Sequence, residues 1–180
     1  MADPGPGGPA VVFKCGPAGS GKSTVARRLE AGGRVRLSID EEAWNRGRRQ
    51  PLPDDVAAIE DDLRRRLIGV VTAGTGVVPD CSFRSRRMRD RHRRPPAPLG
   101  VVPVLVHPAT PRETAPDRIR RRGGADANAV RLGDEVAAGY RDSFDPPEPG
   151  EGPVAVVRPG DDPGALPAAL AAAGRAGARR

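Results

Sequence analysis

Eight consecutive residues near the N-terminus have the types and the spacing that can hold a chain of phosphates. Gly16-Pro17-Ala18-Gly19-Ser20-Gly21-Lys22-Ser23 matches the pattern G-x-x-x-x-G-K-[ST], and Thr24 follows it. Glycines let backbone N–H groups turn inward onto phosphate oxygens. We expect Lys22 to reach the β- and γ-phosphates of ATP and the Ser23 hydroxyl to ligate Mg²⁺. A glycine-rich turn without a ligand and a nucleotide site without catalysis are the alternatives.

The order of elements around this loop is the one that such a cradle needs. Apolar residues 11–15 predict a buried strand before the loop, and Val25 and Leu29 lie four apart after it, as on one face of a helix. Further strands are predicted at 34–39, 76–80, 101–107 and 154–158, and further helices at 54–72, 83–94, 112–122, 134–143 and 166–180. Alternating strands and helices predict an α/β fold, in which a parallel sheet is covered on both faces and the active edge lies at the carboxyl ends of its strands.

Two aspartates are expected at that edge. Asp40 follows the strand at 34–39, and Asp80 ends the strand at 76–80. Asp80 can hold a Mg²⁺-bound water or orient an acceptor molecule, or it can be a turn residue at a strand end. Asp40 can cap the helix that begins at Glu41, since aspartate is a favoured N-cap.

Three prolines fall inside predicted elements. Pro79 and Pro103 lie within expected central strands, where a proline removes a ladder hydrogen bond, and Pro116 lies within the expected helix at 112–122. The limits of these elements are therefore left open by the sequence.

The length and net charge of the chain limit the number of domains and indicate the kind of partner to expect. The 180 residues suit one domain, which we place at 11–174 between a disordered start at 1–10 and a frayed basic tail at 175–180. The formal charge of +7 favours an anionic partner, but only Lys14 and Lys22 are lysines, and such heavy use of arginine can reflect coding bias. The sequence has neither a secretory signal nor a run of about 20 apolar residues, so we expect a cytoplasmic protein.

Other classes of P-loop protein lack their motifs here. A GTPase reads its base with Asn-Lys-x-Asp, and no lysine follows position 22. An ATP-driven motor usually has four apolar residues before its acidic residue, whereas Val77-Val78-Pro79-Asp80 is short and interrupted. Both classes are therefore disfavoured.

Taken together, the motifs resemble those of the small predicted P-loop kinases, which include the kinase domain of polynucleotide kinase, chloramphenicol phosphotransferase and zeta toxins. The resemblance covers about residues 11–158 and lies in the loop and in Ser38-Ile39-Asp40, Asp80-Cys81-Ser82-Phe83, Arg118-Ile119-Arg120-Arg121-Arg122 and Phe144-Asp145-Pro146-Pro147-Glu148. It implies a three-layer P-loop NTPase fold, with a five-stranded parallel sheet of order 2-3-1-4-5 and a small lid at about 118–133. It also implies transfer of the γ-phosphate of ATP to a hydroxyl group.

The same resemblance implies roles for three residues. Asp40 stands where the family keeps the carboxylate that accepts the proton of the acceptor hydroxyl. Arg118 and Arg122 are four apart, so on a helix they share a face and can close over the triphosphate. A solvated basic face is the alternative for these arginines.

The acceptor is the least determined part of the prediction. Arg84, Arg87, Arg91 and Arg94 form a stripe at helical spacing that can line an acceptor groove, unless it is simply solvated. Arg46 can also touch the acceptor, whereas we expect Trp44 in the core. The leading prediction is a small-molecule acceptor; a 5′-hydroxyl polynucleotide kinase and an ATP-binding regulatory protein without transfer are the alternatives.

Overall fold

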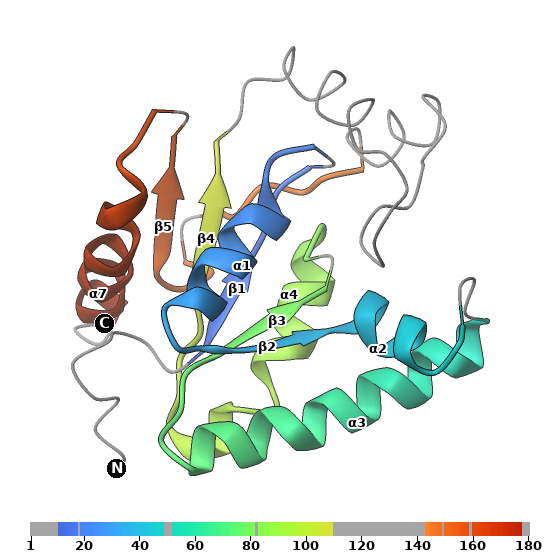
Figure 1. The fold of residues 1–180 in the computed structure, drawn as a ribbon. Helices are drawn as coiled ribbons and strands as arrows, with labels where there is room; N and C mark the ends of the chain where they lie inside the picture. The colour runs from blue at the N-terminus through green and yellow to red at the C-terminus, as the bar shows by residue number, and fades with distance from the viewer. Residues whose placement is uncertain are drawn as a thin grey trace.

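The computed structural model describes residues 11–17, 19–48, 52–81, 83–109, 143–148, 150–158 and 160–177 (Figure 1). Its strands are β1 (Val12–Lys14), β2 (Val35–Ser38), β3 (Val77–Asp80), β4 (Val104–Pro108) and β5 (Val154–Val157). Its helices are α1 (Lys22–Ala31), α2 (Ile39–Asn45), α3 (Pro53–Thr72), α4 (Arg86–Arg93) and α7 (Leu166–Gly177), with short 3₁₀ turns at Ala97–Leu99 and Pro163–Ala165. Strands and helices alternate along the chain as the sequence predicts. The predicted lid at 118–133 and the helices at 112–122 and 134–143 lie outside the described residues, as does the tail beyond 177.

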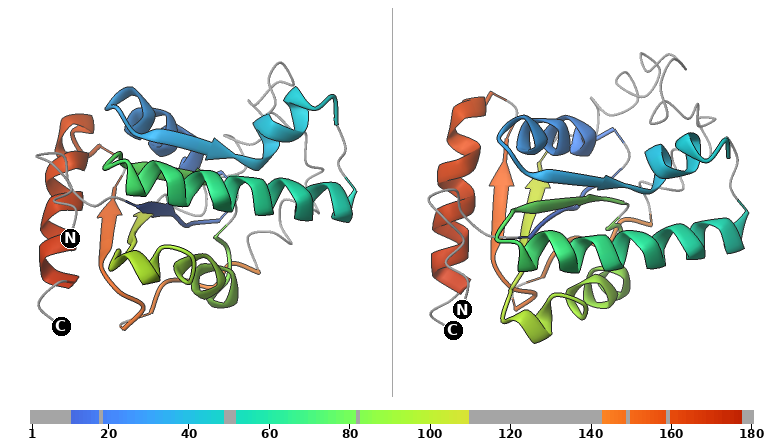
Figure 2. Two further views of the ribbon diagram at one scale, coloured as in Figure 1. Left: turned by 90° about the horizontal axis from the view of Figure 1, so that it is seen from below. Right: turned by 60° about the horizontal axis from the view of Figure 1, so that its bottom comes forward.

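Helices cover both faces of the strands and form three layers (Figure 2). On one face, α3 buries Ile59, Leu63, Leu67 and Val71, which recur every four residues. On the other face, α1 and α7 bury apolar side chains against the even-numbered residues of β1, β3 and β4. Burial of a side chain such as Leu63 stabilises the fold by about 1.5–3 kcal/mol, so the two apolar clusters hold the layers together.

The strands form two parallel groups rather than one continuous ladder. One group has the order β1-β4-β5 and the other pairs β2 with β3. Val11 bridges to Val77 in parallel, which places β3 beside β1. The parallel sheet is thus confirmed, whereas the predicted continuous order 2-3-1-4-5 is only partly seen. We call the junction of β1 and β3 the seam.

Pro79 explains why the ladder stops at the seam. The carbonyl of Gly76 accepts a hydrogen bond from the Val35 N–H at 2.9 Å and so faces β2. Because peptide groups alternate along a strand, those of Val77 and Pro79 face β1. The next rung after the Val77 bridge requires an N–H at position 79, and proline has none. The interior proline that the sequence flagged is therefore accommodated by ending the β1–β3 ladder.

Several element boundaries differ from their predictions for local reasons. The Ser38 hydroxyl accepts a hydrogen bond from the Glu41 N–H at 3.3 Å, so Ser38 caps α2, and the alternative in which Asp40 is the cap is ruled out. Ser85 likewise caps α4, which starts three residues later than predicted and leaves Phe83 in the core. Pro103 lies just before β4, outside the ladder.

A buried ion pair fastens α4 to the segment that precedes β5. Arg89 donates from Nε and Nη2 to the two carboxylate oxygens of Glu151, each at 2.6 Å, and neither side chain is exposed. Its Nη1 also donates to the Asp145 carbonyl at 2.7 Å. Burial alone would raise the pKa of Glu151, but hydrogen bonds from Arg89 and from the Glu148 N–H, with the charges of Arg89 and Arg93, lower it to about 2.

Among the helices that the structure describes, none combines the length and the apolar character that crossing a bilayer requires.

Candidate active site

The loop between β1 and α1 has the backbone of a phosphate cradle. Gly19 and Gly21 adopt φ values of 80° and 95°, a left-handed region that suits glycine. A Cβ atom at Gly16 would lie 2.6 Å from the Ser20 hydroxyl oxygen, so a side chain there would force Ser20 to move. Gly21 is also the N-cap of α1 and has no side chain with which to satisfy the first N–H groups of the helix. Those groups are oriented as a site for phosphate.

Lys22 places its charge at the centre of this loop. Its Nζ atom donates to the carbonyl oxygens of Gly16 and Pro17, both at 2.7 Å. The ammonium thus lies inside the turn that the sequence assigned to phosphate binding, as a lysine that contacts phosphates must.

Ser23 and Thr24 lie in the first turn of α1, as predicted, with Ser23 half-buried and Thr24 exposed. The Ser23 hydroxyl fits Mg²⁺, a hard cation that takes oxygen ligands and is usually shared with substrate phosphates. Within the part of the chain that the structure describes, no group of three or more His, Cys, Asp or Glu side chains is arranged to hold a metal ion. Ala18, the remaining loop residue of the pattern, lies outside the described residues.

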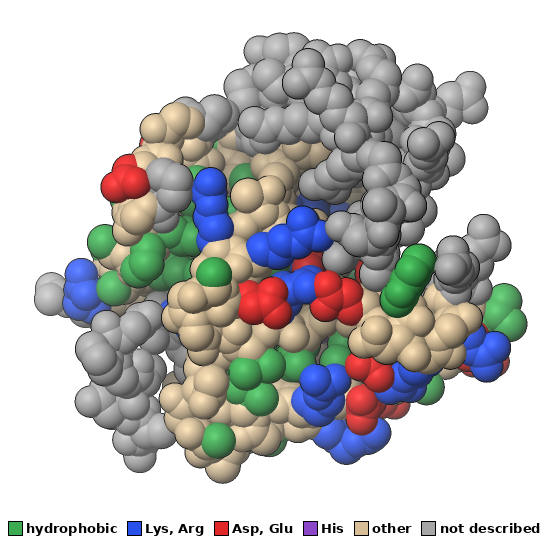
Figure 3. Space-filling model, in the orientation of Figure 1, with side chains coloured by type: hydrophobic (Ala, Val, Ile, Leu, Met, Phe, Trp, Pro, Cys, Tyr) green, Lys and Arg blue, Asp and Glu red, His purple; other side chains and the backbone are tan. Residues whose placement is uncertain are grey.

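Asp80 lies beside the loop in a buried network of charges. Its Oδ1 contacts the Lys14 ammonium across the seam, and its Oδ2 accepts from Nη1 of Arg36 at 2.8 Å. Arg36 also pairs with Glu41 and, at 2.9 Å, with Glu30 of α1. Figure 3 shows acidic and basic side chains side by side on the face that carries α1 and α2. Both oxygens of the predicted metal residue therefore already contact cations.

The network is nearly closed to water. The side chains of Lys14, Arg36 and Asp80 are 3%, 6% and 7% exposed. Burial alone would lower the pKa of Arg36, but hydrogen bonds to Glu41, Glu30 and Asp80 raise it instead. The three carboxylates that contact Arg36 thus stabilise its charged guanidinium.

Asp40 lies in the first turn of α2, at the same edge of the sheet. Ser38, two residues before it, pairs in register with Asp80. Asp40 reaches solvent, but the surrounding chain limits its hydration, which is the main reason that its pKa is raised. The like charges of Asp80 and Glu41 raise the pKa further, and Lys14 lowers it. A carboxylate whose pKa is moved upward is better matched to accept a proton near neutral pH.

The comparisons with known proteins agree with this geometry. A family model described as an AAA domain matches residues 11–147, which is most of the chain. The chain belongs to this AAA domain family. The resemblance to small P-loop kinases that the motifs carry is thereby confirmed. Among curated proteins, none matches the sequence.

Solved kinase structures share the fold of this AAA domain. A sugar kinase from Janibacter sp. HTCC2649 is 22% identical, with a TM-score of 0.62 over 89% of this chain and 91% of that one. A gluconokinase from Sinorhizobium meliloti 1021 is 24% identical, with a TM-score of 0.59 over 95% of each chain. The Mycobacterium tuberculosis APS kinase CysC, in complex with AMPPNP and APS, is 21% identical, with a TM-score of 0.59 over 93% of this chain and 98% of that one. At these identities the likeness shows the fold alone.

The residues predicted to contact the acceptor do not lie together, unlike the residues of the phosphate-binding loop. Arg46 pairs with Glu42 at 2.9 Å and with Asp62 at 3.3 Å, so it joins α2 to α3. Trp44 is 42% exposed, and its expected place in the core is wrong.

The four arginines of the predicted stripe are exposed, and they do not lie on a single helix face. Arg84 precedes α4 and Arg94 ends it, whereas Arg87 and Arg91 lie within it. Arg91 pairs with Glu60 of α3 at 2.8 Å. The catalytic arginines implied by the resemblance, Arg118 and Arg122, lie outside the described residues.

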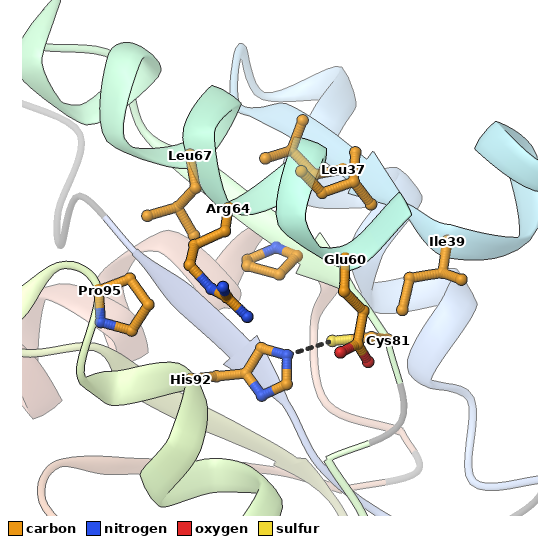
Figure 4. Close-up of a pocket in the computed structure, with 10 residues that line it drawn as sticks. Leu37, Ile39, Glu60, Arg64, Leu67, Cys81, His92 and Pro95 are labelled. Carbon is orange, nitrogen blue, oxygen red and sulfur yellow. Dashed lines mark hydrogen bonds between the residues drawn. The ribbon is translucent and has the colours of Figure 1, made fainter. Parts of the chain in front are cut away.

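A small hollow separates α3 from α4 below the carboxyl edge of β2 and β3 (Figure 4). Its volume of about 40 Å³ has room for about three water molecules. Glu60 and Arg64 reach from α3 toward Cys81 and His92, whose Sγ and Nε2 atoms are 3.9 Å apart.

The Cys81–His92 pair is uncharged and does not form a reactive thiolate. The Nδ1 atom of His92 lies 2.9 Å from the Met88 carbonyl, so it carries the proton and Nε2 is the acceptor. Burial is the main cause that raises the pKa of Cys81 to about 12 and lowers the pKa of His92. Cys81 and His92 therefore add no charge to the lining of this hollow.

Sequence reasoning missed the partners that hold the site together. In the sequence, Lys14 and Arg36 are only members of predicted strands, and no pattern there pairs Arg89 with Glu151. One signal for Lys14 was available, because it is one of only two lysines in an arginine-rich chain.

Proposed function

We propose that this AAA domain transfers the γ-phosphate of Mg·ATP to a hydroxyl group of a small molecule. The observation that carries the proposal is the cradle itself, with the Lys22 ammonium 2.7 Å from two loop carbonyls and the N-terminus of α1 directed into the same turn. The kinase folds among the comparisons support it.

Each described residue of the site has a distinct task in this proposal. The loop amides and Lys22 bind and orient the phosphates, and Ser23 contributes its hydroxyl to Mg²⁺. Bound Mg²⁺ would neutralise phosphate charge. Asp40 accepts the proton of the acceptor hydroxyl. The hydroxyl oxygen then bonds to the γ-phosphorus of ATP, and the bond between that phosphorus and the β–γ bridging oxygen breaks to release ADP. Asp80 helps to orient the acceptor molecule and does not hold the metal, because Lys14 and Arg36 already balance its charge.

The pairing of surface arginines favours a small acceptor over a polynucleotide. Arg46 and Arg91 are exposed, but each contacts carboxylates of α2 or α3. A nucleic-acid surface gains affinity from cations that neutralise phosphates, and arginines already held by Asp or Glu contribute less to it. The predicted contact of Arg84 and Arg87 with the acceptor is kept in this proposal.

A screen with γ-labelled ATP tests the proposal. The parent protein, Asp40→Asn and Lys22→Ala are each incubated with aminoglycosides, phenicols, nucleosides, nucleotide sugars and 5′-hydroxyl oligonucleotides. We expect label on one small-molecule class, a loss of about 10²–10⁴ in kcat for Asp40→Asn with unchanged Mg·ATP affinity, and loss of Mg·ATP binding for Lys22→Ala.

Two outcomes would point elsewhere. Label only on oligonucleotides, with binding that weakens steeply as salt rises, would identify a polynucleotide kinase. Protection of the fold by ATP, without transfer and with no effect of Asp40→Asn, would identify a regulatory ATP-binding protein.

A further inference from the structure

Lysine occurs at only two places in this chain, and both are at the cradle. Lys22 and Lys14 are the only lysines among 30 lysine and arginine residues. In a chain that uses arginine almost everywhere else, the two lysines draw attention to the positions that carry a compact ammonium. Lys22 has a role in the cradle, and the structure suggests one for Lys14.

Lys14 lies at the carboxyl end of β1, immediately before the cradle and 2% exposed. The bridge between Val11 and Val77 sets the register of the seam, and counting three residues along each strand brings Lys14 opposite Asp80. The Lys14 ammonium contacts Asp80 Oδ1 there. A guanidinium is larger and forked and would need more room than this buried position offers.

Three carboxylates lie at this edge of the sheet, and Lys14 contacts one of them, Asp80. Asp80 is in register with Ser38, so the start of α2 that carries Asp40 and Glu41 lies next to it. Arg36 of β2 faces Glu41, Asp80 and Glu30. Three charged groups act on the Asp40 carboxylate. The negative charges of Asp80 and Glu41 raise its pKa, and the positive charge of Lys14 lowers it.

We propose that Lys14 is a positioning residue for phosphoryl transfer: its buried ammonium fixes Asp80 at the seam and thereby sets the charge environment of the neighbouring Asp40 carboxylate, which accepts the hydroxyl proton. The proposal rests on the proposed function for its catalytic consequence, but the charge relation between Lys14 and Asp40 exists in the free protein. Lys14 acts through Asp40 and transfers no proton itself.

The test is the pKa of Asp40, followed by carboxyl ¹³C NMR in the free parent and in Lys14→Met, with Asp40→Asn to assign the signal. Loss of this opposite charge should raise the Asp40 pKa above its value in the parent. The control is Arg65→Met, which removes the same charge from an exposed pair with Asp62 on α3. It should leave the Asp40 pKa where it is in the parent.

Kinetics then separate a positioning role from a structural one. In Lys14→Met the acid limb of the kcat profile should move to higher pH by the same amount, so the lost rate returns as pH rises, while Mg·ATP affinity is retained. A lower melting temperature with no shift in either the NMR pKa or the acid limb would overturn the proposal. A shifted Asp40 pKa in a protein that phosphorylates nothing would overturn the proposed function instead and leave the charge relation standing.

A second pair of variants covers the case in which Lys14→Met does not fold. Asp80→Asn and Lys14→Met/Asp80→Asn differ only by the lysine, and the double variant leaves no uncompensated Asp80 charge. The Asp40 pKa should be higher in the double variant than in Asp80→Asn, and equal values would refute the proposal.

Discussion

Replacing Glu151 by glutamine removes the charge from the buried pair that fastens α4. The magnitude can be worked in two ways. Breaking a buried ion pair by removing one partner typically costs about 3–5 kcal/mol. Independently, the pKa of Glu151 is lowered from 4.5 to about 2, and each unit corresponds to about 1.4 kcal/mol, which gives about 3 kcal/mol. We therefore expect Glu151→Gln to lose about 3 kcal/mol of unfolding free energy at pH 7.

Urea unfolding measures this loss against a matched control. Glu148→Gln makes the same chemical change three residues away, at a side chain that is 69% exposed and 3.4 Å from Arg86. An exposed pair of this kind contributes at most about 1 kcal/mol, so the control should stay close to the parent.

The pH dependence supplies a second readout with a definite sign. Because the folded-state pKa of Glu151 is depressed, its contribution is fully present above pH 4.5 and is lost as pH falls from 4.5 toward 2. The stability gap between the parent and Glu151→Gln should therefore shrink over this window. Equal losses in Glu151→Gln and Glu148→Gln, or a gap that does not change between pH 5 and pH 2.5, would refute the reasoning.

Three further predictions concern the backbone and the thiols. Gly21→Ala should lose about 1–2 kcal/mol of unfolding free energy and weaken Mg·ATP binding, because φ is 95° there. Gly69→Ala, on the open side of α3, should instead gain about 0.5–1 kcal/mol. Losses of equal size in thermal melts of the two variants would contradict this. Ser38→Ala should lose about 1 kcal/mol in urea unfolding because it removes the cap of α2, and an unchanged midpoint would argue against the cap. Burial raises the pKa of Cys81 to about 12, so this thiol should react with iodoacetamide at pH 8 about 10³ times more slowly than a free thiol with its ordinary pKa. Mass spectrometry follows the reaction in native and urea-unfolded protein. Equal rates in the two would show that Cys81 is not buried.

The features that the sequence predicts well are those set by near neighbours along the chain. The cradle depends on residues within one turn of each other, and the spacing of Ile59, Leu63 and Leu67 is enough to predict α3 and its buried face. Such patterns carry their own geometry, because a helix or a tight turn is closed within a few residues.

What the sequence could not predict depends on partners far along the chain. Arg89 is one of seven arginines between 84 and 94, and only contact with Glu151, 62 residues later, makes it the buried one. Lys14 likewise looks like an ordinary strand residue until the register of the seam brings Asp80 to it. The end of the β1–β3 ladder required knowledge of which neighbour the missing N–H of Pro79 would face.

A sheet interrupted in this way gives the domain a built-in line of weakness. In the described residues, β-bridge pairing between the β1 and β3 sides is confined to Val11 and Val77, with the Lys14–Asp80 side-chain contact beyond it. Opening along this line would break no ladder in either group, so amide protons inside each ladder would keep their hydrogen bonds. The cost of such an opening would fall on side chains, because both apolar clusters contain residues from the two sides of the seam.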